Sequence, residues 1–182
     1  MATSRRAASR TSEFSRSRGT SSSPSASSRI APADRVALLI ATVGGAGYSP
    51  VAPGTVGSAL TVAILWLVPF SPRGVIAFCV VVTLVGVWAA GRAERVLGGK
   101  DPGAIVIDEV AGMTLSVLAF PLTLPTLAVG FVLFRIFDIV KPFPARASQH
   151  ARGGLGVVVD DLIAGLYALA ALGLLRAVIG WS

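Results

Sequence analysis

Two uncharged apolar runs lie next to each other in the chain and constrain its fold more than any other feature. They cover residues 55–70 and 74–90 and are separated by Ser71, Pro72 and Arg73, a break typical of a turn. At about 1.5 Å per residue each run forms a helix of roughly 25 Å, close to the roughly 30 Å hydrocarbon core of a bilayer. The pattern predicts a transmembrane hairpin whose flanking residues complete both spans.

Three further apolar segments follow, at 104–120, 126–140 and 157–179, and each contains ionised residues. A shorter apolar segment, at 36–43, is too brief to cross a bilayer. With 53% apolar and 14% charged residues, the composition also departs from that of a soluble globular protein. We therefore predict an all-α fold, a multi-spanning membrane helical bundle over residues 34–182.

The first 33 residues have a different character. Eleven of the first thirty are serine and six are arginine, with few large apolar side chains. Such a segment cannot bury enough surface to offset its ordering entropy, so we predict a disordered basic tail over residues 1–33. An organelle transit peptide has a similar composition and stays open as an alternative, whereas the apolar core of a secretory signal is missing.

The basic residues predict the orientation of the helices. They gather in two of the connections, while the connection at 121–125 carries no charge and Arg73 is a lone exception. Because basic residues mark the cytoplasmic side, we place the amino terminus and these two connections in the cytoplasm. The basic residues concerned are Arg92, Arg95 and Lys100, then Lys141, Arg146 and Arg152.

Five of the nine acidic residues lie inside apolar segments. An ionised carboxylate at the centre of a bilayer costs at least ~2.5 kcal/mol, so these residues need a compensating cation or a role. Helices that alternate in direction bring all five to the cytoplasmic face. The five are Asp108, Glu109, Asp138, Asp160 and Asp161.

Carboxylates without a histidine or cysteine cluster form a hard, oxygen-donor site. Such a site suits Mg²⁺ or Mn²⁺ and argues against zinc. The competing interpretation is that the acids are only salt-bridged, with Asp138 paired to Arg135 or Lys141, each three positions away on one helical face. Two bases cannot satisfy five acids, which favours the metal site.

Two features predict a phosphate site on the same face. A glycine-rich loop at 44–58 leads into the first full span, where backbone amides, hydroxyls and a helix amino terminus suit an anion; its candidate residues are Gly54, Thr55, Gly57 and Ser58. Arg135 and Lys141 add a bidentate donor and a point charge. Ordinary turn chemistry for the loop, and positive-inside anchoring for the two bases, remain open as alternatives.

Four stretches follow one another in the chain: 49–58, 107–113, 134–144, and 153–156 together with 160–165. In order and spacing they resemble the phosphatidylglycerophosphatase A family over about residues 36–179. Together with the helix orientation given above, which places the site on the cytoplasmic side, the resemblance implies magnesium-dependent hydrolysis of phosphatidylglycerophosphate to phosphatidylglycerol at the bacterial inner membrane. It also implies that the five acids are the metal and catalytic carboxylates.

Two other functions compete with this interpretation. The CDP-alcohol phosphotransferases also place aspartates at helix ends, but their continuous motif within one segment is missing here. A cation- or proton-coupled transporter would use intramembrane acids as a relay, although acids gathered at one face do not form a path across the membrane. We expect a phospholipid substrate and the membrane as partners and no nucleic acid, and we make no prediction of oligomeric state.

Overall fold

The structure, a computed structural model, describes residues 30–99, 102–145 and 153–181. Within these ranges every regular element is a helix, which confirms the predicted all-α class. Most of the predicted tail lies outside the described residues, as do Lys100, Arg146 and Arg152. The elements are α1 (Pro32–Ala41), the short 3₁₀ helix η1 (Ala46–Tyr48), α2 (Pro53–Leu67), α3 (Pro72–Leu97), α4 (Ile107–Ser116), α5 (Leu124–Val140) and α7 (Gly154–Ile179).

Local sequence explains where several helices begin. Proline stands in the first turn of α1, α2, α3 and α5, where its missing N–H costs nothing. The predicted break at 71–73 forms the start of α3, because the Ser71 hydroxyl accepts a hydrogen bond from the Gly74 amide at 3.1 Å. Thr123 caps α5 in the same way through the Thr126 amide, at 3.4 Å.

Two helices are long and apolar enough to cross a membrane. Helices α3 and α7 each have 26 residues, about 39 Å at about 1.5 Å per residue. Only 28% and 22% of their most apolar stretches are buried inside the protein, so most of that surface faces outward. Helix α2, with 15 residues, and α5, with 17, are shorter. The described residues therefore contain two candidate spans, fewer than the predicted bundle has.

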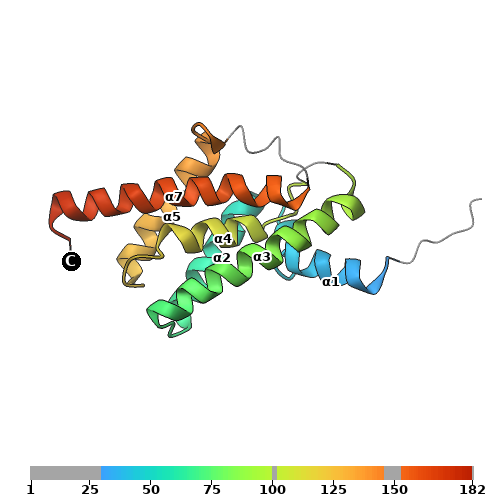
Figure 1. The fold of residues 1–182 in the computed structure, drawn as a ribbon, viewed down its shortest axis with the longest axis horizontal. Helices are drawn as coiled ribbons and strands as arrows, with labels where there is room; N and C mark the ends of the chain where they lie inside the picture. Colours follow the sequence, from blue (N-terminus) through green and yellow to red (C-terminus); the bar gives the residue numbers. More distant parts are fainter. Residues whose placement is uncertain (1–29, 100–101, 146–152, 182) are drawn as a thin grey trace, which may run out of the picture.

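Helix α4 differs from the span predicted at 104–120, because it has only ten residues. Eight of the ten are buried, and α4 contacts α2, α3, α5 and α7. Figure 1 shows it running between α3 and α7. A helix enclosed by protein does not need the length of a bilayer. Its Met113 belongs to the central core with Leu65, Phe134 and Leu172.

Glycines let α4 and α7 approach until their backbones touch. A Cβ atom on Gly165 of α7 would collide with the Gly112 carbonyl of α4. A Cβ atom on Gly112 would in turn collide with the Asp161 carbonyl and the Phe134 ring. At the start of α7, Gly154 lies equally close to the backbone of α3. These contacts fix α7 against both neighbours at the end of the molecule where the acidic residues lie.

Helix α1 lies against α3 at the same end (Figure 1). Asp34 of α1 accepts a hydrogen bond from Arg92 of α3 at 2.8 Å. The loop before α4 is held by a hydrogen bond from the Val106 amide to the Ala41 carbonyl, at 2.9 Å. Helix α1 therefore helps to fix the position at which α4 begins.

Candidate active site

A cavity of about 350 Å³ opens where α2 and α4 begin and α5 ends. Most of the predicted acidic and basic site residues line it, so the structure gathers them at one end of the helices. Asp160 does not line the cavity, but it contacts Lys141, which does line it. The lining residues are Ala52, Pro53, Gly54, Gly103, Ile105, Asp108, Glu109, Arg135, Asp138, Ile139, Lys141 and Asp161.

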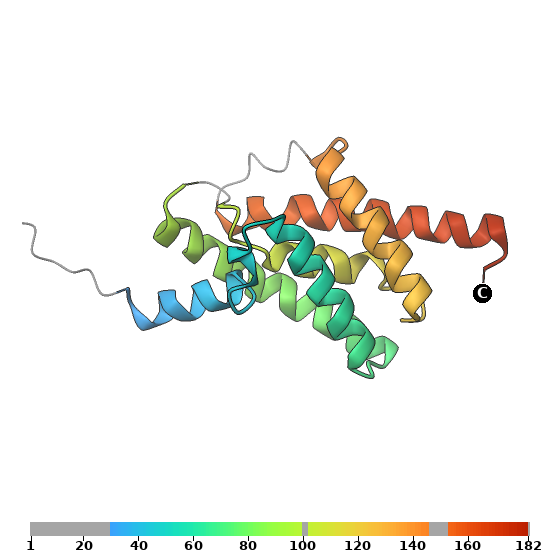
Figure 2. The same ribbon diagram turned by 180° about the vertical axis from the view of Figure 1, so that it is seen from behind.

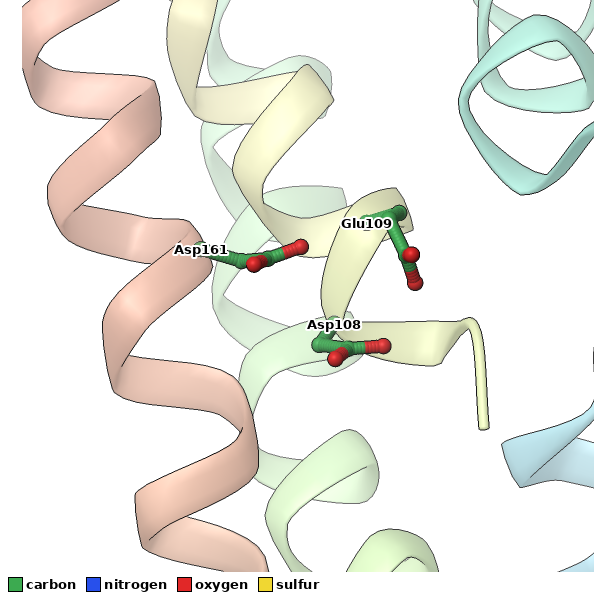
Figure 3. A group of neighbouring side chains, drawn as sticks. All are labelled: Asp108, Glu109 and Asp161. Carbon is green, nitrogen blue, oxygen red and sulfur yellow. The ribbon is translucent and has the colours of Figure 1, made fainter. Parts of the chain in front are cut away.

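Three carboxylates form the acidic centre of the cavity. Asp108 and Glu109 lie in the first turn of α4, and Asp161 comes from the second turn of α7 (Figure 3). Each offers an oxygen, and these oxygens all lie within 4.8 Å of one another. We call this set the carboxylate triad. The amino terminus of α4 favours the negative charge of its first two members through the helix dipole.

The triad fits a divalent cation. Asp108 and Asp161 are buried, and Glu109 is nearly so. Glu109 Oε2 and Asp161 Oδ2 are buried and have no hydrogen-bond partner among the described residues. A buried carboxylate oxygen without a partner is costly, and a bound cation removes that cost. Oxygen ligands of this kind are those that hard cations prefer.

Arg135 lies beside the triad on the last turns of α5. Its Nη1 atom is 2.8 Å from Asp138 Oδ2 and 4.0 Å from Glu109 Oε1. Nε and Nη1 of Arg135 are buried and make no hydrogen bond of good geometry within the described parts of the chain. The charges of Asp138 and Glu109 thus hold the Arg135 guanidinium at the wall of the cavity.

Lys141 ends α5 in a left-handed conformation, with φ of 47°. Its ammonium donates a hydrogen bond to the Asp160 carboxylate and lies 3.7 Å from Asp138 Oδ1. Burial lowers the pKa of Lys141, but the Asp160 hydrogen bond and the charges of Asp160, Asp161 and Asp138 outweigh it and raise the pKa above its ordinary value. Lys141 is therefore a cation throughout the neutral range.

The five predicted acids divide into two groups. Three form the triad, while Asp138 contacts both Arg135 and Lys141, and Asp160 contacts Lys141. The salt-bridge alternative thus describes Asp138 and Asp160. It does not describe the triad as a whole, because Arg135 and Lys141 already contact Asp138 and Asp160, and two bases do not neutralise five acids.

The glycine-rich loop reaches the cavity through only one of its four predicted phosphate-binding residues. Gly54 lines the cavity, whereas Thr55, Gly57 and Ser58 are not among its lining residues. The Ser58 hydroxyl donates to the Gly54 carbonyl at 2.8 Å, and Gly57 packs against Val106. Phosphate binding by these residues stays a prediction.

Sequence reasoning missed five residues that line the cavity. Ile139 follows Asp138 directly, and Ala52 and Pro53 belong to the glycine-rich loop, so their neighbours give a signal. Gly103 and Ile105 precede α4 in a loop whose return toward α1 depends on the Val106–Ala41 hydrogen bond, which no local pattern indicates.

Gly54 provides a test of the site's geometry. A Cβ atom there would collide with Glu109 Oε1 and approach the Arg135 guanidinium, so Gly54→Ala should displace the Glu109 carboxylate. We expect about a tenfold loss of divalent-cation affinity, comparable to loss of a group that orients a ligand. Calorimetric titration with Mn²⁺ measures it. Gly173→Ala, on α7, where a Cβ makes ordinary contact, is the matched control and should bind as wild type. Equal affinity in both variants would contradict the geometry.

The fold combines two helices that are long and apolar enough to cross a membrane with a cluster of carboxylates that could hold a metal ion, and two bases lie beside this cluster. The family model for phosphatidylglycerophosphatase A matches residues 39–176. The chain belongs to the phosphatidylglycerophosphatase A family, and with it to the phosphoric monoester hydrolases.

Three relatives cover most of the chain. The Escherichia coli K12 phosphatidylglycerophosphatase A is 35% identical over 74% of this chain and 80% of its own length. The Haemophilus influenzae phosphatidylglycerophosphatase A is 36% identical over 72% and 83%. A Bacteroides thetaiotaomicron protein named as a candidate phosphatidylinositol-3-phosphatase is 40% identical over 79% and 95%. No solved structure matches the chain at a significant level.

Proposed function

We propose that the protein hydrolyses the phosphomonoester of phosphatidylglycerophosphate, releasing phosphatidylglycerol and phosphate, and that it requires Mg²⁺. The observation that carries the proposal is the carboxylate triad, which shares a cavity with Arg135 and Lys141 in a chain of this family. The names of the Escherichia coli and Haemophilus influenzae relatives support the substrate.

Asp108, Glu109 and Asp161 would hold the metal. When bound, Mg²⁺ supplies Lewis acidity toward a phosphoryl oxygen and lowers the pKa of a bound water. The triad matches its preference for carboxylate oxygens. Glu109 Oε2 and Asp161 Oδ2, which have no hydrogen-bond partner in the described part of the chain, would gain most from the metal.

The bases would bind the substrate phosphate. Arg135 would bind the phosphoryl oxygens through its guanidinium, and Lys141 would add a second positive charge as negative charge develops on the phosphoryl group. Asp138 and Asp160 act as positioning residues in this scheme, since they hold the two bases at the cavity. The five acids therefore have two roles, three toward the metal and two toward the bases.

We further propose a multi-spanning protein of the bacterial inner membrane whose cavity faces the cytoplasm. The relatives are bacterial proteins, and α3 and α7 are candidate spans. Arg92 and Arg95 lie near the end of α3 that meets the start of α7, where Gly91 and Gly154 are in contact. This is the cavity end, and basic residues there agree with a cytoplasmic orientation.

The test is phosphate release by the purified full-length protein in detergent. With phosphatidylglycerophosphate and Mg²⁺ we expect steady release, and chelation by EDTA should reduce it to background until Mg²⁺ is restored. Phosphatidylinositol 3-phosphate serves as the competing substrate, because one relative is named for it. Faster turnover of that lipid would overturn the headgroup assignment. A transporter would release no phosphate from either lipid, and activity that survives EDTA would overturn the metal requirement.

A further inference from the structure

An apolar groove lies between α2 and α5, apart from the catalytic cavity. The two helices contact each other and lie side by side on one face of the molecule (Figure 2). The groove has a volume of about 330 Å³ and is lined by Ala59, Val62, Ala128, Phe131 and Val132. Ala59, Ala128 and Val132 are exposed, while Val62 and Phe131 are half-buried. Its walls carry no ionisable side chain.

The groove is in line with the catalytic cavity along both helices. On α2, Gly54 lines the cavity, and Ala59 and Val62 follow one to two turns later. On α5, Arg135 lines the cavity, and Val132 and Ala128 precede it by one to two turns. At about 1.5 Å per residue, the groove begins roughly 5–8 Å from the cavity and extends to roughly 10–12 Å.

We propose that this groove holds an acyl chain of the lipid substrate while its phosphate occupies the cavity. The inference rests on the proposed function, because the substrate proposed there has a phosphate for the cavity and apolar chains for the groove. In such a lipid the headgroup glycerol and the phosphodiester separate the terminal phosphate from the diacylglycerol. The groove is likewise separated from the cavity, along the axes of α2 and α5.

The groove contributes orientation more than affinity. An acyl chain that leaves the bilayer exchanges one apolar environment for another, so little hydrophobic free energy is gained. Holding the chain between α2 and α5 instead limits the positions that the phosphate can take against Arg135 and the triad, which favours the reactive geometry. We therefore expect groove substitutions to change the preference for long-chain substrate.

The experiment fills the groove from either wall with Ala59→Trp or Ala128→Trp. The readout is the ratio of kcat/KM for dioleoyl to that for dihexanoyl phosphatidylglycerophosphate, measured in the same detergent. We expect each variant to lower the ratio about tenfold relative to wild type. Ala77→Trp on α3 is the matched control, because Ala77 is equally exposed and lies outside the groove and the cavity. It should leave the ratio unchanged.

A photolabelling measurement on wild-type protein avoids any dependence on variants that fold poorly. A phosphatidylglycerophosphate carrying a diazirine on one acyl chain should label residues of the groove on α2 and α5, and an excess of unlabelled phosphatidylglycerophosphate present during irradiation should prevent the labelling. Labelling elsewhere, an unchanged ratio in both groove variants, or an equal fall in Ala77→Trp would overturn the proposal. So would a change of oligomeric state in the groove variants, which would assign the groove to a second copy of the chain. Wild type inactive on both lipids would instead refute the proposed function.

Discussion

Asp161→Asn is expected to lower kcat for the lipid phosphomonoester by at least about a hundredfold. The substitution keeps the volume of a buried side chain but removes the charge of one of three converging carboxylates. Loss of a group that merely orients a metal ligand costs about 10- to 100-fold, so loss of a proposed ligand should cost at least the upper figure. The fold should persist, because the residue's main-chain contact with Gly112 is unaffected.

Cation affinity and activity should fall together in this variant. Mn²⁺ binding followed by electron paramagnetic resonance reports the affinity, and phosphate release reports turnover. Asp34→Asn is the matched control, since it removes an aspartate charge from the Arg92 pair on α1, away from the cavity. We expect that control to retain nearly full activity. Wild-type turnover in Asp161→Asn would contradict the assignment of the triad as the metal site.

Arg135→Lys is expected to lower kcat/KM by about a hundredfold although the charge is kept. A guanidinium offers several donors in a fixed plane, whereas an ammonium is a point charge on a flexible stem. Arg135 has two buried nitrogen atoms without a hydrogen bond of good geometry among the described residues. Losing such preorganised donors to the transition-state oxyanion costs about 10²- to 10³-fold in well-studied cases.

The Arg135 prediction separates phosphate recognition from simple charge. Arg95→Lys, at an exposed position of α3, is the matched control and should behave as wild type. Inhibition by inorganic phosphate gives a second measurement, and its inhibition constant should rise in Arg135→Lys alone. If the variant kept both its kcat/KM and its phosphate inhibition, Arg135 would serve only to hold Asp138.

Periodic and compositional signals in the sequence predicted the helical class and the convergence of the acids. In lipid, an uninterrupted apolar run can form all of its backbone hydrogen bonds within the segment only as a helix. Proline with a capping hydroxyl marks the start of α3. Alternating helix directions then brought Asp108, Asp138 and Asp161 to one cavity, as the structure shows. The same reasoning foresaw the two bases beside them.

Features that depend on contacts between distant segments were not predictable in this way. An apolar stretch is equally consistent with a lipid-facing span and with an enclosed helix, so the short α4 was mistaken for a full span. The division of the acids depends on Lys141 reaching Asp160, nineteen positions away. The backbone contact at Gly112 and Gly165 joins two helices, and no pattern in either sequence indicates that they pack together.

The meeting of α4 and α7 at Gly112 and Gly165 has a consequence for ion selectivity. Gly112 lies one turn beyond Asp108, and Gly165 one turn beyond Asp161, so main-chain contact sets the distance between the two carboxylates. Side-chain repacking or a change of bilayer thickness does not easily alter such a distance. Two carboxylates at a fixed separation suit the short bonds of about 2.0–2.1 Å that Mg²⁺ requires. They accommodate poorly the bonds of about 2.3–2.6 Å that Ca²⁺ forms. We therefore expect Ca²⁺ to support the proposed activity less well than Mg²⁺.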